Sequence, residues 1–100
     1  MSDNTIKLAK VNDVPVPAAE PGHIQIVRVD PGPVTVYGTV TRQNNTVTCT
    51  LVGPGKGTSQ NVTASGNNWQ AGFGTVPAGQ YHLSACAPNE GCDNATVIVS

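Results

Sequence analysis

The chain has 100 residues, of which only 11% are charged, and its formal net charge is −1. A chain of this length suits one domain, because domains typically have about 100–150 residues. The near-zero charge excludes a polybasic nucleic-acid-binding protein, since phosphate neutralisation needs clustered Lys and Arg. Val and Thr are abundant, with 14 and 11 residues, and these β-branched residues prefer strands to helices. The composition therefore predicts a β-rich single domain.

Neither a membrane-spanning segment nor a secretory leader is visible in the sequence. No stretch approaches the roughly 18 apolar residues of a transmembrane helix. The first residues, Met-Ser-Asp-Asn-Thr-Ile-Lys, lack the apolar run of a leader. We therefore expect no membrane partner, and either a chain that is used without secretion or one from which an export signal has been removed.

Residues 1–22 differ in composition from the rest of the chain. They contain Pro15, Pro17 and Pro21, and these prolines exclude a helix beyond Val14. We therefore predict an extended N-terminal arm over residues 1–22, with a disordered linker as the alternative. Such an arm can bind a partner by adding a strand to the edge of its sheet. The candidate partner-binding residues are five apolar anchors and two lysines suited to an acidic partner: Ile6, Lys7, Leu8, Lys10, Val11, Val14 and Val16.

Residues 23–100 are predicted to form short strands separated by turns. Apolar and polar residues alternate, so that Val34, Val36 and Val40 share one face. Around Ile26 and Val27 the alternation changes phase, which predicts a β-bulge. Strands at roughly ten-residue spacing, each with one polar face, predict an all-β fold, an antiparallel β-sandwich of about seven strands. The predicted strands are 23–29, 34–41, 47–51, 59–64, 69–73, 81–87 and 95–99.

The cysteines allow one local disulfide. Cys86 and Cys92 bracket a short loop whose ends can approach to bonding distance, so a disulfide between them is sterically allowed. Cys49 alternates with Val47 and Leu51, as a small buried residue would. No CxxC or HxxxH spacing suited to zinc occurs, and we expect neither a metal nor a cofactor.

Three segments carry a resemblance to a known family. In chain order they are Val34-Thr-Val-Tyr-Gly-Thr-Val40, Gly66-Asn-Asn-Trp69 and Val76-Pro-Ala-Gly-Gln-Tyr81. Their order and spacing resemble the bacterial and phage immunoglobulin-like domains over residues 23–99. The resemblance implies an immunoglobulin-like β-sandwich over residues 23–100, in which the ring of Trp69 would cap the core. It also implies a tyrosine-corner hydrogen bond from Tyr81 to the upstream backbone.

The same resemblance implies a role in binding or spacing, as in phage capsid decoration proteins. We therefore expect a non-enzymatic virion structural protein, a decoration or cement protein on the capsid surface that is made in the host cytoplasm. The arm would bind the major capsid protein or another virion protein, and virion symmetry would supply multiple copies. The alternative is an adhesin or carbohydrate-binding module of a bacterial surface protein or phage tail.

The chain offers few groups for catalysis, and we predict that it is not an enzyme. His82 and Ser84 share a strand face, but no acid accompanies them to orient the histidine. The acids lie in the arm or in turns, without a pair on one strand face for acid–base work. We expect Glu90 and Asp93 in a solvated turn rather than in a calcium site. Tyr37 and His82 are candidates for a face that binds host-surface glycans weakly.

Overall fold

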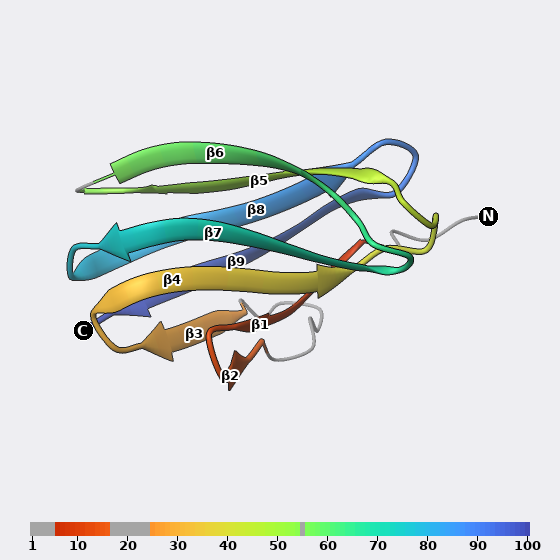
Figure 1. Cartoon of the computed structure of the whole chain (residues 1–100). Coiled ribbons are helices and arrows are strands. Elements are labelled where there is room, and N and C mark those ends of the chain that lie inside the picture. The colour runs from red at the N-terminus through yellow and green to blue at the C-terminus, as the bar shows by residue number, and fades with distance from the viewer. Residues whose placement is uncertain (1–5, 17–24, 55) are drawn as a thin grey trace.

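The computed structural model describes residues 6–16, 25–54 and 56–100, and the elements of these residues are all β-strands (Figure 1). Several of the turns between them use a non-glycine residue with positive φ, and each of these residues is an asparagine, which tolerates that region. In chain order the strands are β1 (Lys7–Val11), β2 (Val14–Pro15), β3 (Ile26–Val29), β4 (Gly32–Thr39), β5 (Thr46–Gly53), β6 (Lys56–Thr63), β7 (Asn68–Val76), β8 (Gly79–Ala87) and β9 (Gly91–Val99).

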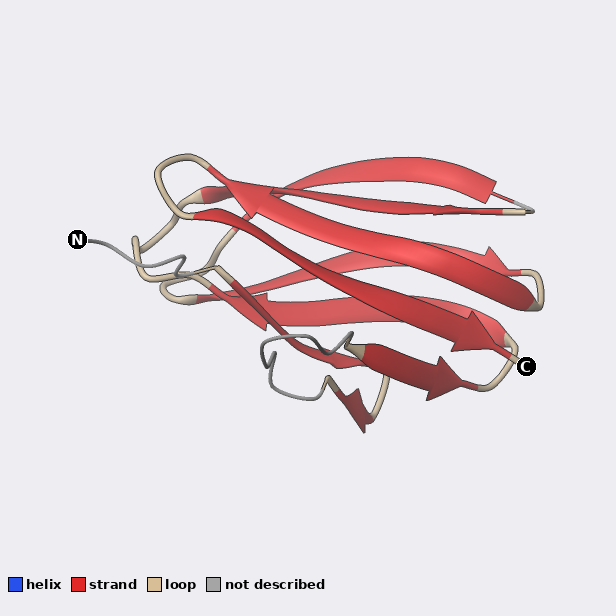
Figure 2. Ribbon diagram, turned by 180° about the vertical axis from the view of Figure 1, so that it is seen from behind, coloured by secondary structure: helices blue, strands red, loops and turns tan. Residues whose placement is uncertain are grey.

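The strands form two sheets that pack face to face, as Figure 1 and Figure 2 show from opposite sides. The first sheet has four strands in the order β2-β1-β4-β7, and the second has five in the order β3-β9-β8-β5-β6. Neighbouring strands are antiparallel, apart from β3 and β9, which run parallel. The fold is therefore the all-β sandwich predicted from the alternation, with two strands more than the seven expected.

The hydrophobic core lies between the two sheets. Along β4, Val34 and Val36 are fully buried, whereas Thr35 and Tyr37 face outward and are partly exposed. The same period of two runs through β5, β8 and much of β7 and β9, because each strand packs one face on the other sheet. Each fully buried valine or leucine contributes roughly 1.5–3 kcal/mol, so this alternation is the main source of stability.

The predicted strands from residue 34 onwards each overlap an observed strand, β4 to β9. The first predicted strand is shorter than expected, since β3 begins at Ile26, and His23 lies outside the described residues. The expected bulge between Ile26 and Val27 is wrong. Gln25 and Val27 are buried and Ile26 is 46% exposed, so the alternation continues and Ile26 faces solvent.

The part of residues 1–22 that the structure describes belongs to the sandwich and is not an extended arm. Lys7–Val11 form β1, which pairs with β4, and Val14–Pro15 form β2, which folds back on β1. The prediction of an arm is therefore wrong for this segment. Its apolar side chains gain more by covering one end of the core than by remaining in water. The predicted boundary between residues 22 and 23 lies outside the described residues.

Burial separates the seven candidate partner-binding residues into three groups. Three are buried in the core, with exposures of 5% or less: Ile6, Leu8 and Val11. Two are partly buried and pack against the core: Val14 and Val16. The other two have exposed side chains: Lys7 and Lys10. The buried residues cannot act as anchors for a partner while the domain is folded.

A β-bulge at Ala9 explains the irregular pattern of β1. The register with β4 shifts between Leu8 and Lys10, so that Ala9 and Lys10 both face outward while Leu8 and Val11 both face the core. In a regular strand, residues three apart point to opposite faces. The bulge thus lets β1 bury two apolar residues at this spacing, and it places Lys10 opposite Tyr37.

The turn between β1 and β2 is held against β4 by Asn12. Its φ of 53° lies in the left-handed region, which Asn adopts more readily than most residues. The Asn12 backbone N–H donates to the carbonyl of Thr35 at 2.8 Å, and its Oδ1 accepts from the Thr35 N–H at 2.9 Å. Its Nδ2 donates to the carbonyl of Pro33 at 3.1 Å. These three bonds continue the pairing of β1 with β4 into the turn.

Tyr81 stabilises the turn before β8. Its ring is 1% exposed, and its hydroxyl donates to the carbonyl of Pro77 at 2.8 Å. The tyrosine-corner bond that the resemblance implied is therefore present. Gly53 makes room for the ring, because a Cβ at this position would lie 2.3 Å from it.

Candidate functional site

A pocket of about 580 Å³ opens on the outer face of the four-stranded sheet. Most of its lining comes from β1, β4 and β7, which are neighbours in this sheet. Pro15 of β2, Thr63 of β6 in the other sheet, and Ser65 complete it. Its volume falls within the range of roughly 300–1,000 Å³ that is typical of small-molecule sites. The side chains that give it chemical character are Lys10, Tyr37, Thr39, Asn68, Trp69 and Gln70.

Lys10 and Tyr37 form the charged and aromatic part of the pocket. They are register partners in β1 and β4, and the Lys10 Nζ lies 4.8 Å from the centroid of the Tyr37 ring. The ring quadrupole attracts the ammonium, but at an exposed site this is worth only about 0.5–1 kcal/mol. The bulge at Ala9 brings Lys10 onto the outer face, so the pocket depends on that irregularity.

Trp69 lies at the floor of the pocket, with its ring turned toward the core. It is 4% exposed, as expected for a ring that caps the core, and its Nε1 donates to the carbonyl of Thr39 at 3.3 Å. Its cross-strand partner is Gly38. A Cβ on Gly38 would lie 2.3 Å from the Trp69 ring and 2.3 Å from the Lys7 carbonyl. Only glycine therefore allows the ring to lie across β4.

Amide side chains form a polar rim of the pocket on the same face as Tyr37. Asn68 and Gln70 flank Trp69 on β7 and are exposed. The start of β7 is fixed by two backbone hydrogen bonds between Ser65 and Asn68, of 2.7 and 3.2 Å. A side-chain amide offers both donors and an acceptor. The pocket can therefore make hydrogen bonds to hydroxyl groups next to an aromatic ring.

The two aromatic candidates for one glycan-binding face lie on different sheets. Tyr37 is on β4, in the four-stranded sheet, whereas His82 faces solvent on β8, in the five-stranded sheet. A single face formed by both residues is therefore wrong. Ser84, the residue that shares a strand face with His82, has its hydroxyl 3.7 Å from the Cys86 Sγ.

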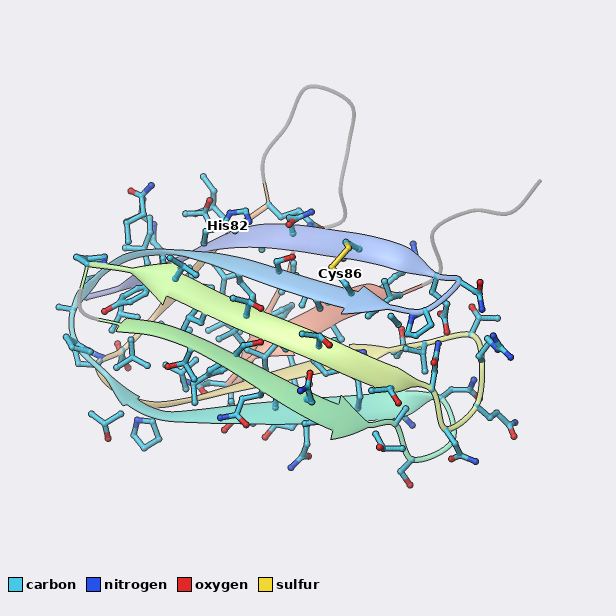
Figure 3. The ribbon with its side chains drawn as sticks, turned by 90° about the horizontal axis from the view of Figure 1, so that it is seen from above. His82 and Cys86 are labelled. Atoms are coloured by element: carbon cyan, nitrogen blue, oxygen red, sulfur yellow. A yellow bond between two sulfur atoms is a disulfide. The ribbon has the colours of Figure 1, made fainter. Side chains whose placement is uncertain are left out.

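Cys86 and Cys92 form a disulfide between β8 and β9. Figure 3 shows the disulfide on β8, the strand that also carries His82. The two cysteines are register partners, with their Cα atoms 4.0 Å apart. Cys49 is a free, buried cysteine, and desolvation raises the pKa of its thiol from 9.0 to about 12. A thiol that stays protonated at neutral pH is a poor nucleophile, so Cys49 is a core residue.

Glu90 is buried, and the expectation of a solvated turn is wrong for it. It is 2% exposed, and its carboxylate accepts hydrogen bonds from the backbone N–H groups of Thr41 and Arg42 at 2.8 and 3.0 Å. It also accepts one from the Asn45 Nδ2 at 2.9 Å. Glu90 thus fastens the loop between β4 and β5 to the turn between β8 and β9.

Asp93 makes a similar connection at the start of β9. Its Oδ2 accepts from the backbone N–H of Leu8 at 2.9 Å, and its Oδ1 accepts from the Gln25 Nε2 at 3.1 Å. Gln25 also donates to the carbonyl of Asn94. The residues that begin β1 and precede β3 are thereby tied to β9. Asp93 and Glu90 hold the fold together and lie apart from the pocket lining.

The described residues contain neither a cluster of metal-ligating side chains nor a membrane-spanning helix. Within residues 6–16, 25–54 and 56–100, no three His, Cys, Asp or Glu side chains come together as a set that could hold a metal ion. The same part of the chain has no helix with the length and hydrophobicity needed to cross a bilayer.

The chain has no match among known protein families or among curated protein sequences. The pocket therefore has to be interpreted from its own residues. The sequence singled out Lys10 and Tyr37 for separate reasons, but it did not bring them together and did not indicate Asn68 or Gln70. One feature of the sequence could have indicated that Lys10 faces outward. Leu8 and Val11 are three residues apart, and two such residues can both face the core of a strand only if a bulge between them turns both Ala9 and Lys10 outward.

Proposed function

We propose that this chain is a non-enzymatic binding domain whose pocket on the four-stranded sheet takes a carbohydrate. The observation that carries the proposal is the lining, in which Tyr37 lies opposite Gln70 across β4 and β7, with Asn68 on the same face of β7. A sugar ring has an apolar face that packs on an aromatic ring. Its hydroxyl groups donate and accept hydrogen bonds, as side-chain amides do.

The lining supports binding rather than bond cleavage. Hydrolysis of a glycosidic bond needs two carboxyl groups across the bond, and the described lining residues include neither Asp nor Glu. The carboxylates of Glu90 and Asp93 are used as acceptors within the fold. Lys10 faces the Tyr37 ring, and the part of the lining that the structure describes has no acid to take up or return a proton.

The strand order supports the immunoglobulin-like family that the sequence resembles. If β3 is counted as the first of seven strands, the second and fifth (β4 and β7) pair in one sheet. The third, sixth and seventh (β5, β8 and β9) share the other sheet. Immunoglobulin-like sandwiches divide these strands in the same way. The first and fourth strands, β3 and β6, depart from the constant-type pattern, because β3 pairs with β9 and β6 pairs with β5.

The test is binding of the protein, displayed in many copies on a bead, to an array of immobilised glycans, since avidity makes weak sites measurable. We expect Tyr37→Ala to lower binding by about tenfold, the effect of losing one good aromatic contact. His82→Ala is the matched control on the opposite sheet and should bind as the unchanged protein does. Equal binding by Tyr37→Ala and the unchanged protein would reject the pocket as the glycan site.

A second candidate function is the capsid decoration protein expected from the resemblance. Among the described residues, two large apolar side chains are exposed, Ile26 at 46% and Val52 at 50%. They lie on the outer face of the five-stranded sheet in one cross-strand row with Thr96 and His82. Exposed apolar side chains on one face suit a protein contact. In this proposal the folded face docks on the major capsid protein or another virion protein, with no role for an arm.

Co-sedimentation tests the decoration proposal if a major capsid protein gene lies beside the gene for this chain. Shells assembled from that capsid protein should carry the unchanged domain into the pellet. Val52→Lys should lower the bound fraction, because a charge is costly in an apolar contact. Tyr37→Ala, on the other sheet, should leave it unchanged. Failure of the unchanged domain to sediment with the shells would reject the decoration function.

A further inference from the structure

The charge in the pocket narrows the class of ligand. Among the described residues of the lining, Lys10 alone carries a full charge, and it has no carboxylate beside it there. Its ammonium instead rests over the Tyr37 ring at 4.8 Å from the centroid. A cation–π contact at an exposed site is weaker than a hydrogen bond between an ammonium and a carboxylate. The ammonium is therefore free to exchange the ring for an anionic ligand.

The position of Lys10 also controls access to Tyr37. While the ammonium covers the ring, a sugar cannot stack on that face. When the ammonium moves to an anion in the pocket, the Tyr37 ring is exposed next to the amides of Asn68 and Gln70. A ligand that carries both an anion and a sugar ring would use both groups at once.

We propose that the pocket binds an acidic saccharide, a sugar residue that carries a carboxylate. Lys10 pairs with the carboxylate, the apolar face of the sugar ring packs on Tyr37, and Asn68 and Gln70 bind its hydroxyl groups. This inference rests on the proposed function, because it specifies the carbohydrate that the same pocket takes.

A carboxylate suits the site better than a phosphate group. The described residues of the lining offer one ammonium and no guanidinium, whereas phosphate sites commonly use the planar fork of Arg or several backbone N–H groups. One ammonium balances the single charge of a carboxylate. A phosphorylated ligand would keep part of its charge without a partner.

The experiment compares two sugars that differ only at the carboxylate. Methyl β-D-glucuronide and methyl β-D-glucoside are titrated into the ¹⁵N-labelled protein, and the NMR shifts of the residues that line the pocket give Kd. We expect the glucuronide to bind about tenfold more tightly, as one additional charge-assisted hydrogen bond allows. Raising the salt concentration should reduce this preference, because salt screens exposed charges.

Two variants test whether Lys10 causes the preference for the glucuronide over the glucoside. Lys10→Met keeps the aliphatic stem and removes the charge, and it should bind both sugars equally. Lys7→Met is the control, because Lys7 is exposed on the same strand but does not line the pocket; it should keep the preference for the glucuronide. A preference that persists in Lys10→Met would overturn the inference.

The remaining outcomes separate this inference from the proposed function. If both sugars bind in the pocket with equal Kd, the carbohydrate function stands and the acidic class is wrong. If neither sugar shifts the pocket residues, both proposals are rejected. Glucose 6-sulfate is the third probe, and tighter binding of it than of the glucuronide would overturn the choice of a carboxylate.

Discussion

Glu90 shows how one buried charge can join two loops that are far apart in the sequence. Its two carboxylate oxygens accept three hydrogen bonds from the segment between β4 and β5. A hydrogen bond to a charged group contributes about 1.5–3 kcal/mol, and a buried donor left without a partner costs about 1–3 kcal/mol. The charge is therefore tolerated in a nearly closed site because the loop supplies its donors.

Replacing Glu90 by Gln should destabilise the domain by about 2 kcal/mol. Glutamine has one oxygen and one NH₂ group, so at least one of the N–H groups of Thr41 and Arg42 would face another donor. The free energy of unfolding, measured by urea denaturation, tests this. Asp30→Asn is the control, since Asp30 is an exposed carboxylate and its change should have no measurable effect. An equally small effect of Glu90→Gln would show that the loop does not depend on the carboxylate.

Cys49 should be unreactive towards thiol reagents in the folded protein. Burial raises the pKa of its thiol from 9.0 to about 12, and only the thiolate reacts. Alkylation followed by intact-mass measurement should add no label to the folded, oxidised protein and one label after unfolding in urea. Reduction before unfolding should raise this to three, because it frees Cys86 and Cys92. Rapid labelling of the folded protein would contradict the buried position.

The same raised pKa makes stability fall at alkaline pH. Below the unfolded-state pKa of 9.0 the thiol is protonated in both states, and its contribution to stability is fully present. Between 9.0 and about 12 only the unfolded state ionises, so the contribution is lost as the pH rises. Cys49→Ala should therefore show a smaller loss of unfolding free energy over this pH range than the unchanged protein.

Most of the strands from β4 to β9 could be predicted because apolar and polar residues alternate along most of their length, whereas β6 is almost wholly polar. Val34 and Val36 in β4 and Leu83 and Ala85 in β8 all face the core, and this period of two is visible in the sequence. The strand β1 escaped prediction because the bulge at Ala9 breaks the alternation. Its pattern looks scattered until the register with β4 is known.

The pocket could be predicted only in part. The sequence identified Tyr37 as an outward-facing aromatic residue and Lys10 as a binding candidate. Their contact is a tertiary one, between strands that are brought together by the fold. Trp69 fits beside β4 only because Gly38 has no Cβ. A glycine in a strand can also mark a bulge or a bend, so the sequence does not show that Gly38 makes room for a ring. The burial of Glu90 likewise depends on donors about fifty residues away in the chain.

The place of β1 in the fold can be tested by comparing two adjacent side chains. Leu8 is 5% exposed and its backbone N–H donates to Asp93, whereas Lys7 is exposed. Leu8→Ala should lower the free energy of unfolding by about 3 kcal/mol, a typical cost for a buried leucine. Lys7→Ala should change it by less than about 0.5 kcal/mol. If residues 6–16 were an undocked arm, both variants would be as stable as the unchanged protein.

The two ends of the described chain are joined in the finished sandwich. The backbone N–H of Leu8 bonds to Asp93, 85 residues later, and β3 pairs with β9 along its whole length. Each such contact closes a long loop, whose entropy has to be overcome before the contact adds stability. The domain therefore depends on pairings that are distant in the sequence, and helices that could form early are not part of the described fold.

This topology predicts slow folding for a chain of 100 residues. Sandwiches dominated by distant pairings fold in roughly milliseconds to seconds, whereas small helical bundles fold in microseconds to milliseconds. Trp69 is the single tryptophan of the chain and is buried, so its fluorescence reports on the closing of the core. Stopped-flow dilution from urea should show a main phase within that millisecond-to-second range. A main phase completed within the dead time would contradict a fold that is limited by long-range pairing.

The same measurement on a variant reports when β1 joins the sheet. Leu8→Ala should mainly raise the unfolding rate if β1 joins the sheet after the transition state.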